Sequence, residues 1–389
     1  MSEIHYSPSR RLLGGLRIAS LISVAVFGLG LYFDARDTWS GFLLGFTYVT
    51  GLGLAGGVFI SVLYLTSSRW GVALRRVPEA MAGTLPWMAV CGVVLLFGIP
   101  SLYSWSHAAT AEHSPLVAQK AGWLNVPFFC VRMVLYFAVW IWVTRRLIGE
   151  SRSQDDDGDR VHSSRNLKNA ALFMATFAVT FSLASIDWIQ SLEPEWFSTI
   201  YALLTVAGLI GSGLAVVMVM CVLLRAAGPL RGVLTDDHLD DLGKVAMGFA
   251  LFWVYIWYCQ YMLIWYTNMP EETSHYILRA SGAWSVLTPA NLILNFLVPF
   301  LVLMPKRARR SGAVILRVGL VMLVGHALDL YILIKPPLEA DGPGFGLWQL
   351  APMVGIGCLF VTVLLRKLAE APLVPTRDPF LSKSLHYHA

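Results

Sequence analysis

The chain has 389 residues, of which 56% are apolar and only 14% are charged. Soluble domains carry about 25% charged residues, so this composition excludes an ordinary water-soluble globule and indicates a membrane protein. The net charge of +5 comes from bases in short segments between apolar runs. It therefore reports on membrane topology, and we expect no nucleic-acid partner.

Ten apolar segments are long enough to cross a bilayer, which requires about 20 residues each. They cover residues 13–33, 39–66, 79–99, 125–147, 166–192, 196–224, 243–268, 275–304, 313–334 and 348–368. If the N-terminus is cytoplasmic, 24 of the 29 Lys and Arg residues fall in cytoplasmic segments, as the positive-inside rule requires. The sequence thus predicts an all-α multi-pass protein with both termini in the cytoplasm.

Two polar stretches lie outside these spans. Residues 148–167 carry four Asp residues among Ser, Arg and Gly, a composition that predicts a mobile linker between the fourth and fifth spans. The tail after Ala371 is rich in Pro and is expected to be either a docking segment or a disordered end.

The cysteines and histidines argue against metal chemistry in this chain. Its five cysteines form no C-x-x-C pair, so neither haem attachment nor an iron–sulfur cluster is expected. Only His326 lies well inside a span, and it has no His partner at helical spacing. We therefore predict no metal ligands and no bound redox centre.

Charged residues inside spans form a pattern that repeats four spans apart. Arg132 in span four precedes Asp187 in span five, and Arg279 in span eight precedes Asp329 in span nine. Spans two and six share glycine-rich runs at 53–57 and 208–212. An even offset predicts a parallel repeat. The expected units are residues 1–38 with the first span, four-helix bundles at 39–192 and 193–334, and a last span with its tail at 335–389.

These charges have two interpretations. In the first, the pairs Arg132–Asp187 and Arg279–Asp329 bracket a polar cavity where a carboxylate exchanges protons. Thr176 and Thr180 would lead to Asp187 along one helix face, His326 would lie beside Asp329, and Glu271 and Glu272 would cap the entrance of span eight. In the second, each pair only fastens two helices together, and the hydroxyls bond helix to helix.

Aromatic residues crowd span seven beyond the depth of an interfacial belt. Tyr258, Gln260, Tyr261 and Trp265 would suit a quinone headgroup if they shared a pocket, and helix packing is the alternative explanation.

Five segments carry a resemblance to a known family. They are 187–201 (DWIQSLEPEWFSTIY), 260–272 (QYMLIWYTNMPEE), 329–331 (DLY), 75–80 (RRVPEA) and 125–129 (NVPFF). Together they resemble the F-type membrane subunit of bacterial alternative complex III, the quinone-binding subunit 2 of a quinol:cytochrome c oxidoreductase in the NrfD/PsrC-like superfamily. The resemblance extends over about residues 10–370.

The resemblance implies a ten-helix subunit of the bacterial inner membrane that supports quinol oxidation in a respiratory chain and contributes a proton path. Asp187, Glu193, Glu271, Glu272 and Asp329 occupy the family's acidic positions. The implied partners are a C-type NrfD-like membrane subunit, a multihaem cytochrome c, an iron–sulfur subunit and a monohaem cytochrome c. The partners would hold the haems and clusters, and this chain would bind at most a quinone or quinol. A stand-alone secondary transporter is the alternative, because such proteins also combine repeats with intramembrane charges.

Overall fold

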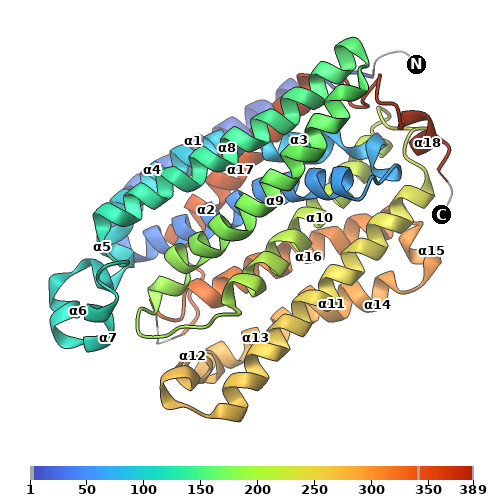
Figure 1. Ribbon diagram of the computed structural model, residues 1–389. Coiled ribbons are helices and arrows are strands. Elements are labelled where there is room, and N and C mark those ends of the chain that lie inside the picture. The colour runs from blue at the N-terminus through green and yellow to red at the C-terminus, as the bar shows by residue number, and fades with distance from the viewer. Residues whose placement is uncertain (1–3, 340–341, 388–389) are drawn as a thin grey trace.

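The computed structural model describes residues 4–339 and 342–387 and consists of long helices stacked side by side (Figure 1). Within that part of the chain, ten helices are long and apolar enough to cross a membrane. The spans run over Arg10–Phe33, Ala35–Leu65, Arg76–Leu102, Val126–Asp157, Arg160–Leu192, Tyr201–Ala226, Asp236–Thr267, Gly282–Leu303, Gly312–Ile334 and Leu347–Ala369. The prediction of an all-α multi-pass membrane protein with ten spans is confirmed.

Several spans consist of more than one helical element. Seven are single helices: α1 (Arg10–Phe33), α2 (Ala35–Leu65), α8 (Val126–Asp157), α10 (Tyr201–Ala226), α11 (Asp236–Thr267), α16 (Gly312–Ile334) and α17 (Leu347–Ala369). Span three joins α3 (Arg76–Ala82), α4 (Leu85–Leu95) and α5 (Ile99–Leu102), and span five joins α9 (Arg160–Trp188) to a short turn at Gln190–Leu192. Shorter helices α6 (Ala108–His113), α7 (Pro115–Gln119), α15 (Lys306–Arg309) and α18 (Leu381–Leu385) lie between or after the spans.

Span eight is shorter than the sequence suggested. The segment predicted to start at residue 275 begins instead with a separate helix, α12 (Pro270–Ala280), which ends at Ser281. Gly282 then adopts φ 54°, a left-handed conformation that glycine reaches without steric cost. The span follows as α13 (Leu287–Leu292), a π-helical turn at Ile293–Leu297 and α14 (Val298–Leu303). Arg279 therefore lies in α12, before the membrane-spanning part.

The two glycine-rich helices lie at the centre of the molecule. Helices α2 and α10 pack against each other, while α9 packs on α2 and α16 packs on α10. Their approach is close: a Cβ added to Gly213 of α10 would lie 2.1 Å from the Cβ of Ala55 on α2, well inside contact distance. Gly213 thus lets α10 approach α2 closely, whereas glycines of the span-two run face other helices: a Cβ added to Gly56 would lie 2.5 Å from the Pro78 carbonyl of α3, and one added to Gly57 would lie 2.4 Å from Phe173 of α9.

The loop at 148–167, expected to be mobile, is helical almost throughout. Helix α8 continues to Asp157, where Gly158 closes it in the left-handed conformation with φ 75°. Asp159 then caps α9 by accepting a hydrogen bond from the Val161 amide. The linker prediction was wrong because Arg, Glu and Gln are good helix formers, and the two long helices extend beyond their apolar parts as a hairpin.

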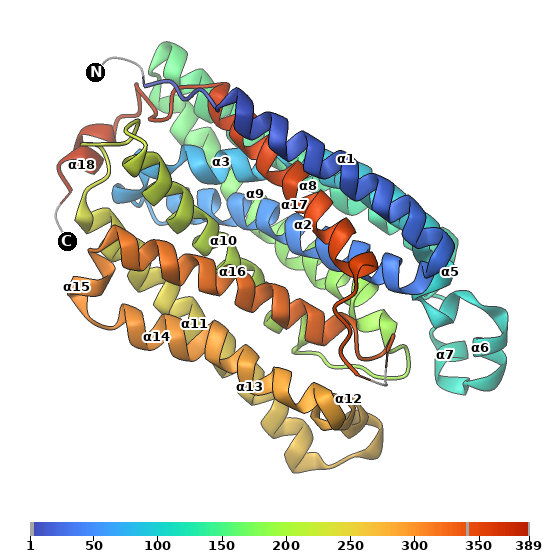
Figure 2. The same cartoon turned by 180° about the vertical axis from the view of Figure 1, so that it is seen from behind.

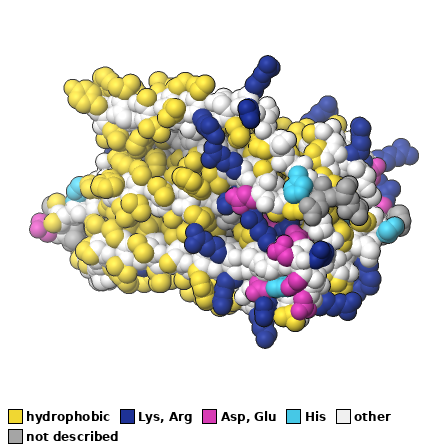
Figure 3. Space-filling model, turned by 90° about the horizontal axis from the view of Figure 1, so that it is seen from above, with side chains coloured by type: hydrophobic (Ala, Val, Ile, Leu, Met, Phe, Trp, Pro, Cys, Tyr) yellow, Lys and Arg dark blue, Asp and Glu magenta, His cyan; other side chains and the backbone are white. Residues whose placement is uncertain are grey.

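Both ends of the described chain lie at one end of the bundle, which we call the terminal end (Figure 1). Lys and Arg side chains gather toward that end of the face in Figure 3, and the rest of the face is mainly apolar. The end away from it, which we call the opposite end, carries α6, α7, α12 and the loop joining α16 to α17 (Figure 2).

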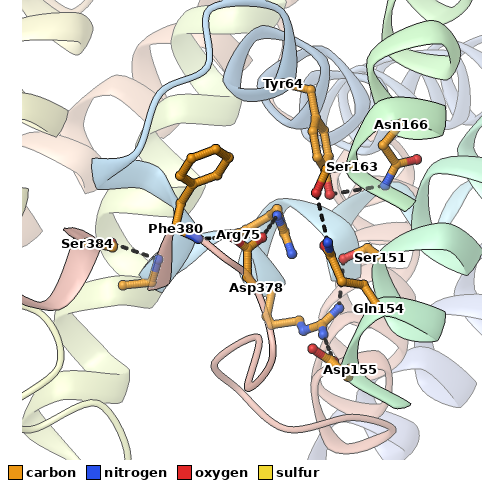
Figure 4. Close-up of polar contacts among 12 residues, drawn as sticks. Tyr64, Arg75, Ser151, Gln154, Asp155, Ser163, Asn166, Asp378, Phe380 and Ser384 are labelled. Carbon is orange, nitrogen blue, oxygen red and sulfur yellow. Dashed lines mark hydrogen bonds and ion pairs between the residues drawn. The ribbon is translucent and has the colours of Figure 1, made fainter. Parts of the chain in front are cut away.

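The C-terminal tail is ordered and packs on the terminal end. Asp378 accepts a 2.7 Å hydrogen bond from Arg75, which is also shown in Figure 4. Ser384 accepts from the Ala73 amide at 3.2 Å, and the Tyr387 hydroxyl donates to Asp241 at 2.6 Å. The sequence left open whether this segment docks or is disordered, and the structure shows docking as far as Tyr387. The surface on which the tail docks belongs to the same chain.

Candidate functional site

The predicted pair Arg132–Asp187 is formed between α8 and α9, and both side chains are buried. The guanidinium reaches the carboxylate with two hydrogen bonds of 2.8 Å each, from Nε to Oδ2 and from Nη2 to Oδ1. Trp123 Nε1 donates to Oδ1 at 2.9 Å, and the Tyr136 hydroxyl donates to Oδ2 at 2.8 Å. Asp187 is thus a fully satisfied carboxylate with a bidentate cation beside it.

The threonine track expected to lead to Asp187 does not connect to it. Thr180 donates to the carbonyl of Thr176 at 2.6 Å, and Thr176 donates to the carbonyl of Leu172 at 2.8 Å. Thr180 also accepts a 2.7 Å hydrogen bond from Trp140 Nε1. Seven residues, or about 10 Å of helix, separate Thr180 from Asp187. Both hydroxyls therefore donate to backbone carbonyls of α9, and Thr180 also links α9 to α8 through Trp140.

Arg279 does not pair with Asp329, which corrects the second predicted pair. Its Nη2 lies 2.7 Å from Glu193 Oε1. Its Nε and Nη2 also donate to the carbonyls of Ile332 and Leu333, at 2.9 and 3.1 Å. The reason is the break at the end of α12, which places Arg279 against the last turn of α16, beyond the depth of Asp329.

Glu193 and His275 complete this cluster at the opposite end. His275 Nδ1 lies 3.0 Å from Glu193 Oε1, and Trp196 stacks on the His275 ring at 4.0 Å. Burial alone would raise the pKa of Glu193, but Arg279 and His275 lower it to about 2. Burial, together with the Arg279 charge, lowers the pKa of His275 to about 4. The cluster therefore contains a carboxylate, a guanidinium and a neutral imidazole, and it ties α12 to the end of span five.

Glu271 and Glu272, also expected at this entrance, occupy the first turn of α12. The Glu272 carboxylate accepts a weak 3.4 Å hydrogen bond from the Thr267 hydroxyl. The backbone carbonyl of Glu272 accepts a 3.0 Å hydrogen bond from Trp196 Nε1. Glu271 lines an open depression of about 660 Å³ together with Glu193 and Glu195. Neither side chain contacts Arg279 or Asp329 among the described ion pairs and hydrogen bonds.

The hydrogen-bond donors to Asp329 among the described residues are neutral. Asn291 Nδ2 donates to Oδ1 at 2.8 Å, and Trp253 Nε1 donates to Oδ2 at 3.2 Å. Asn291 is itself oriented by Asn295, whose amide donates to Asn291 Oδ1 at 2.6 Å. Among the described residues, no Lys or Arg lies within 4.0 Å of this carboxylate, although its residue is only 3% exposed.

His326 lies beside Asp329, as its spacing predicted. The two come closest between His326 Nδ1 and Asp329 Oδ2, at 3.9 Å. Within the described part of the chain, this buried Nδ1 has no hydrogen-bond partner. Gly208 makes room for the ring: a Cβ added there would lie 2.8 Å from His326 Cε1. Gly208, in the glycine run of span six, thus provides the space that the His326 ring occupies next to the Asp329 carboxylate.

The two halves therefore place a carboxylate in similar surroundings with different charges. Asp187 on span five accepts from the guanidinium of span four and from the indole N–H of Trp123, which lies just before that span. Asp329 on span nine accepts from an amide of span eight and from the indole N–H of Trp253 on α11, which is span seven. Asn291 has the role that the sequence assigned to Arg279. Asn291 is uncharged, so the pattern of ionisable residues does not include it, although two Asn residues four apart in an apolar span are themselves a signal.

The four residues proposed for a quinone pocket in span seven do not face one space. Tyr258 and Trp265 are 54% and 68% exposed on the outside of α11, whereas Gln260 is 2% exposed and donates to Ser198 Oγ at 3.4 Å. Tyr261 stacks on Trp257 at 5.7 Å. Helix packing and bilayer contact account for these side chains.

Among the described residues there is no group of three or more His, Cys, Asp and Glu that could hold a metal ion. No protein-family model matches the chain, and no curated protein matches its sequence.

Proposed function

We propose that this chain is a membrane subunit of a quinol:cytochrome c oxidoreductase of the alternative complex III type, and that it contributes a proton path. The sequence motifs support this role, and the ten spans agree with it. The basic residues at the terminal end favour an orientation with both termini in the cytoplasm of a bacterial inner membrane. In this proposal the redox centres belong to the C-type, multihaem, iron–sulfur and monohaem partner subunits.

The observation that carries the proton path is the environment of Asp329. A buried carboxylate without a cationic partner is costly to ionise, so this site is built to hold a proton that can leave when a suitable acceptor is present. His326 supplies such an acceptor, because its Nδ1 has no hydrogen-bond partner in the described part of the chain and lies 3.9 Å from Asp329 Oδ2. His326 precedes Asp329 by one helical turn from the terminal end, so a proton from the cytoplasm would reach His326 first and Asp329 second.

Asp187 has a different role in this proposal. Its charge is balanced by Arg132, and each of its two carboxylate oxygens accepts two hydrogen bonds. Such a pair fastens α8 to α9, which is the second of the two interpretations drawn from the sequence. The proton-exchanging group is therefore assigned to the second half of the molecule.

Isolation of the complex tests the assignment. Affinity purification through this chain under mild detergent should recover haem-containing partners and quinol:cytochrome c oxidoreductase activity. A chain that purifies alone, and that catalyses proton-coupled solute uptake in proteoliposomes, would establish the transporter alternative instead.

A further inference from the structure

A cavity of about 610 Å³ lies at the terminal end of the bundle, between α3, α4, α8 and α17. Helices α3 and α17 pack on each other beside it, as do α4 and α8. Its lining includes Arg145 and Arg152 of α8, Lys367 of α17 and Glu79 of α3. These elements belong to the first half of the chain and to the last span, so the cavity is separate from the carboxylate site of the second half.

Three cationic side chains surround the cavity. Arg145 is exposed and has no ion-pair partner among the described residues. Arg152 and Lys367 share the carboxylate of Glu370, at 3.0 and 2.8 Å. The stem of Lys367 lies against Gly83, where an added Cβ would be 3.2 Å from Lys367 Cδ. Three cations beside one carboxylate leave an excess of positive charge, which attracts an anion.

The second carboxylate of the wall, Glu79, is already paired inside the protein. It lies 3.3 Å from Arg75 Nε and 2.5 Å from Arg76 Nη1, and it is 4% exposed. The same two arginines also pair with Asp378 and Asp155, so this buried cluster carries one net negative charge. Including that charge leaves the surroundings of the cavity positive, and the groups that a ligand meets first are the three cations.

The cavity opens onto the lipid-facing surface. Trp87 and Val90 of α4 line it and are 48% and 58% exposed. Val93 continues the exposed apolar face of α4 three residues farther on. Trp142 is also exposed, one turn before Arg145 on α8, and tryptophans at this level are typical of the headgroup region. A molecule in the cavity would therefore contact cations at one end and apolar bilayer-facing surface at the other.

We propose that this cavity binds an anionic phospholipid from the leaflet at the terminal end. The phosphate would lie near Arg145 and Lys367, and an acyl chain would follow Trp87 and Val90 into the bilayer. Basic pockets between spans are suited to anionic headgroups. A soluble anion would contact the same cations but would gain nothing from the apolar wall. The site is distinct from the oxidoreductase role proposed above and does not depend on it.

Lipid titration of the purified full chain, followed by native mass spectrometry, tests the ligand class. Phosphatidylglycerol should bind about tenfold more tightly than phosphatidylcholine with the same acyl chains, because only the former carries a net negative charge. Inorganic phosphate at equal concentration should not displace it. Equal affinities for the two lipids, or displacement by inorganic phosphate, would overturn the proposal.

A pair of charge variants tests the cations. The double variant Arg145→Gln with Lys367→Gln should weaken phosphatidylglycerol about tenfold or more, since two charges near the headgroup are lost. The matched control, Lys306→Gln with Arg307→Gln, removes the same charges from exposed positions of α15 at the terminal end and should leave the affinity unchanged. Equal losses in both double variants would show general attraction to a basic surface and would contradict a site in the cavity.

A steric variant tests the cavity with every charge retained. Gly149 lines the cavity, and a Cβ added there meets no neighbouring heavy atom of the described structure within 4 Å. A phenylalanine at this position extends over the preceding turn toward Arg145, so Gly149→Phe should fill the cavity and weaken phosphatidylglycerol about fivefold or more. Gly248→Phe, at an equally open position on α11, is the control. Thermal midpoints should match the unmodified chain, and if the charge variant does not fold, the steric variant decides. An unchanged affinity in Gly149→Phe would refute the site.

Discussion

Replacing Asp187 by Asn should destabilise the protein much more than the same change at Asp329. At Asp187 the new amide NH₂ must replace Oδ1 or Oδ2, and a guanidinium N–H 2.8 Å away faces each of these atoms. In the variant, two hydrogen-bond donors therefore face each other, the new amide NH₂ and a guanidinium N–H. Arg132 is also left without a counter-charge. Removing one partner of a buried ion pair costs about 3–5 kcal/mol.

At Asp329 the same substitution meets neutral donors in the part of the chain that the structure describes. The amide oxygen can keep the hydrogen bond from Asn291, while the NH₂ turns toward His326 Nδ1, which has no donor of its own in the described structure. The lost contact is the one from Trp253, so the expected cost is about 1 kcal/mol.

Unfolding in mixed micelles by SDS titration, followed by tryptophan fluorescence, measures both free energies. The double variant Arg132→Gln with Asp187→Asn is the control, and it should recover a large part of the stability because no unpaired charge remains. Equal losses at Asp187 and Asp329, or no recovery in the double variant, would refute the assignment of Asp187 as a fastening residue.

Three further predictions follow from the same structure. Because the pKa of His275 is lowered from 6.5 to about 4, its contribution to stability is complete above pH 6.5 and is lost as pH falls toward 4. The lowered pKa of Glu193, about 2 against 4.5, extends the loss between pH 4.5 and 2. The thermal midpoint should therefore fall between pH 7 and 5, and His275→Gln should flatten that part of the profile; an unchanged slope would contradict the burial argument. Deleting residues 372–389 should lower the thermal midpoint, since it removes the partner of Arg75, and Asp378→Asn should reproduce part of the drop; a midpoint unchanged by the deletion would show that the tail contributes nothing. Reporter domains fused at residue 110 and at Ala389 should report the outside and the cytoplasm, respectively, and a C-terminus found outside would overturn the topology.

The spans and the first ion pair could be predicted from sequence for simple reasons. Apolar length is enough to mark a span, and Arg132 and Asp187 lie at matching depth on two consecutive antiparallel helices. The position of a residue in the sequence predicts its depth in the membrane only when the helix is unbroken. The depth predicted for Arg279 was wrong because the chain turns at Ser281–Gly282.

Other features depended on interactions that composition does not show. The acidic segment after residue 148 looked like a linker, yet helix propensity and the Gly158 cap keep it regular. The surroundings of Asp329 depend on Asn291 and Asn295, which are uncharged and so lie outside any pattern of ionisable groups.

The most direct test of the central claim is the number of protons released per electron by the proposed quinol:cytochrome c oxidoreductase complex carrying Asp329→Asn. The complex should assemble and still transfer electrons from quinol to cytochrome c, while proton release per electron falls below that of the unmodified complex and of an Asp187→Asn complex that survives purification. Unchanged proton release per electron in Asp329→Asn would contradict the assignment of Asp329 and His326 as the proton-exchanging site.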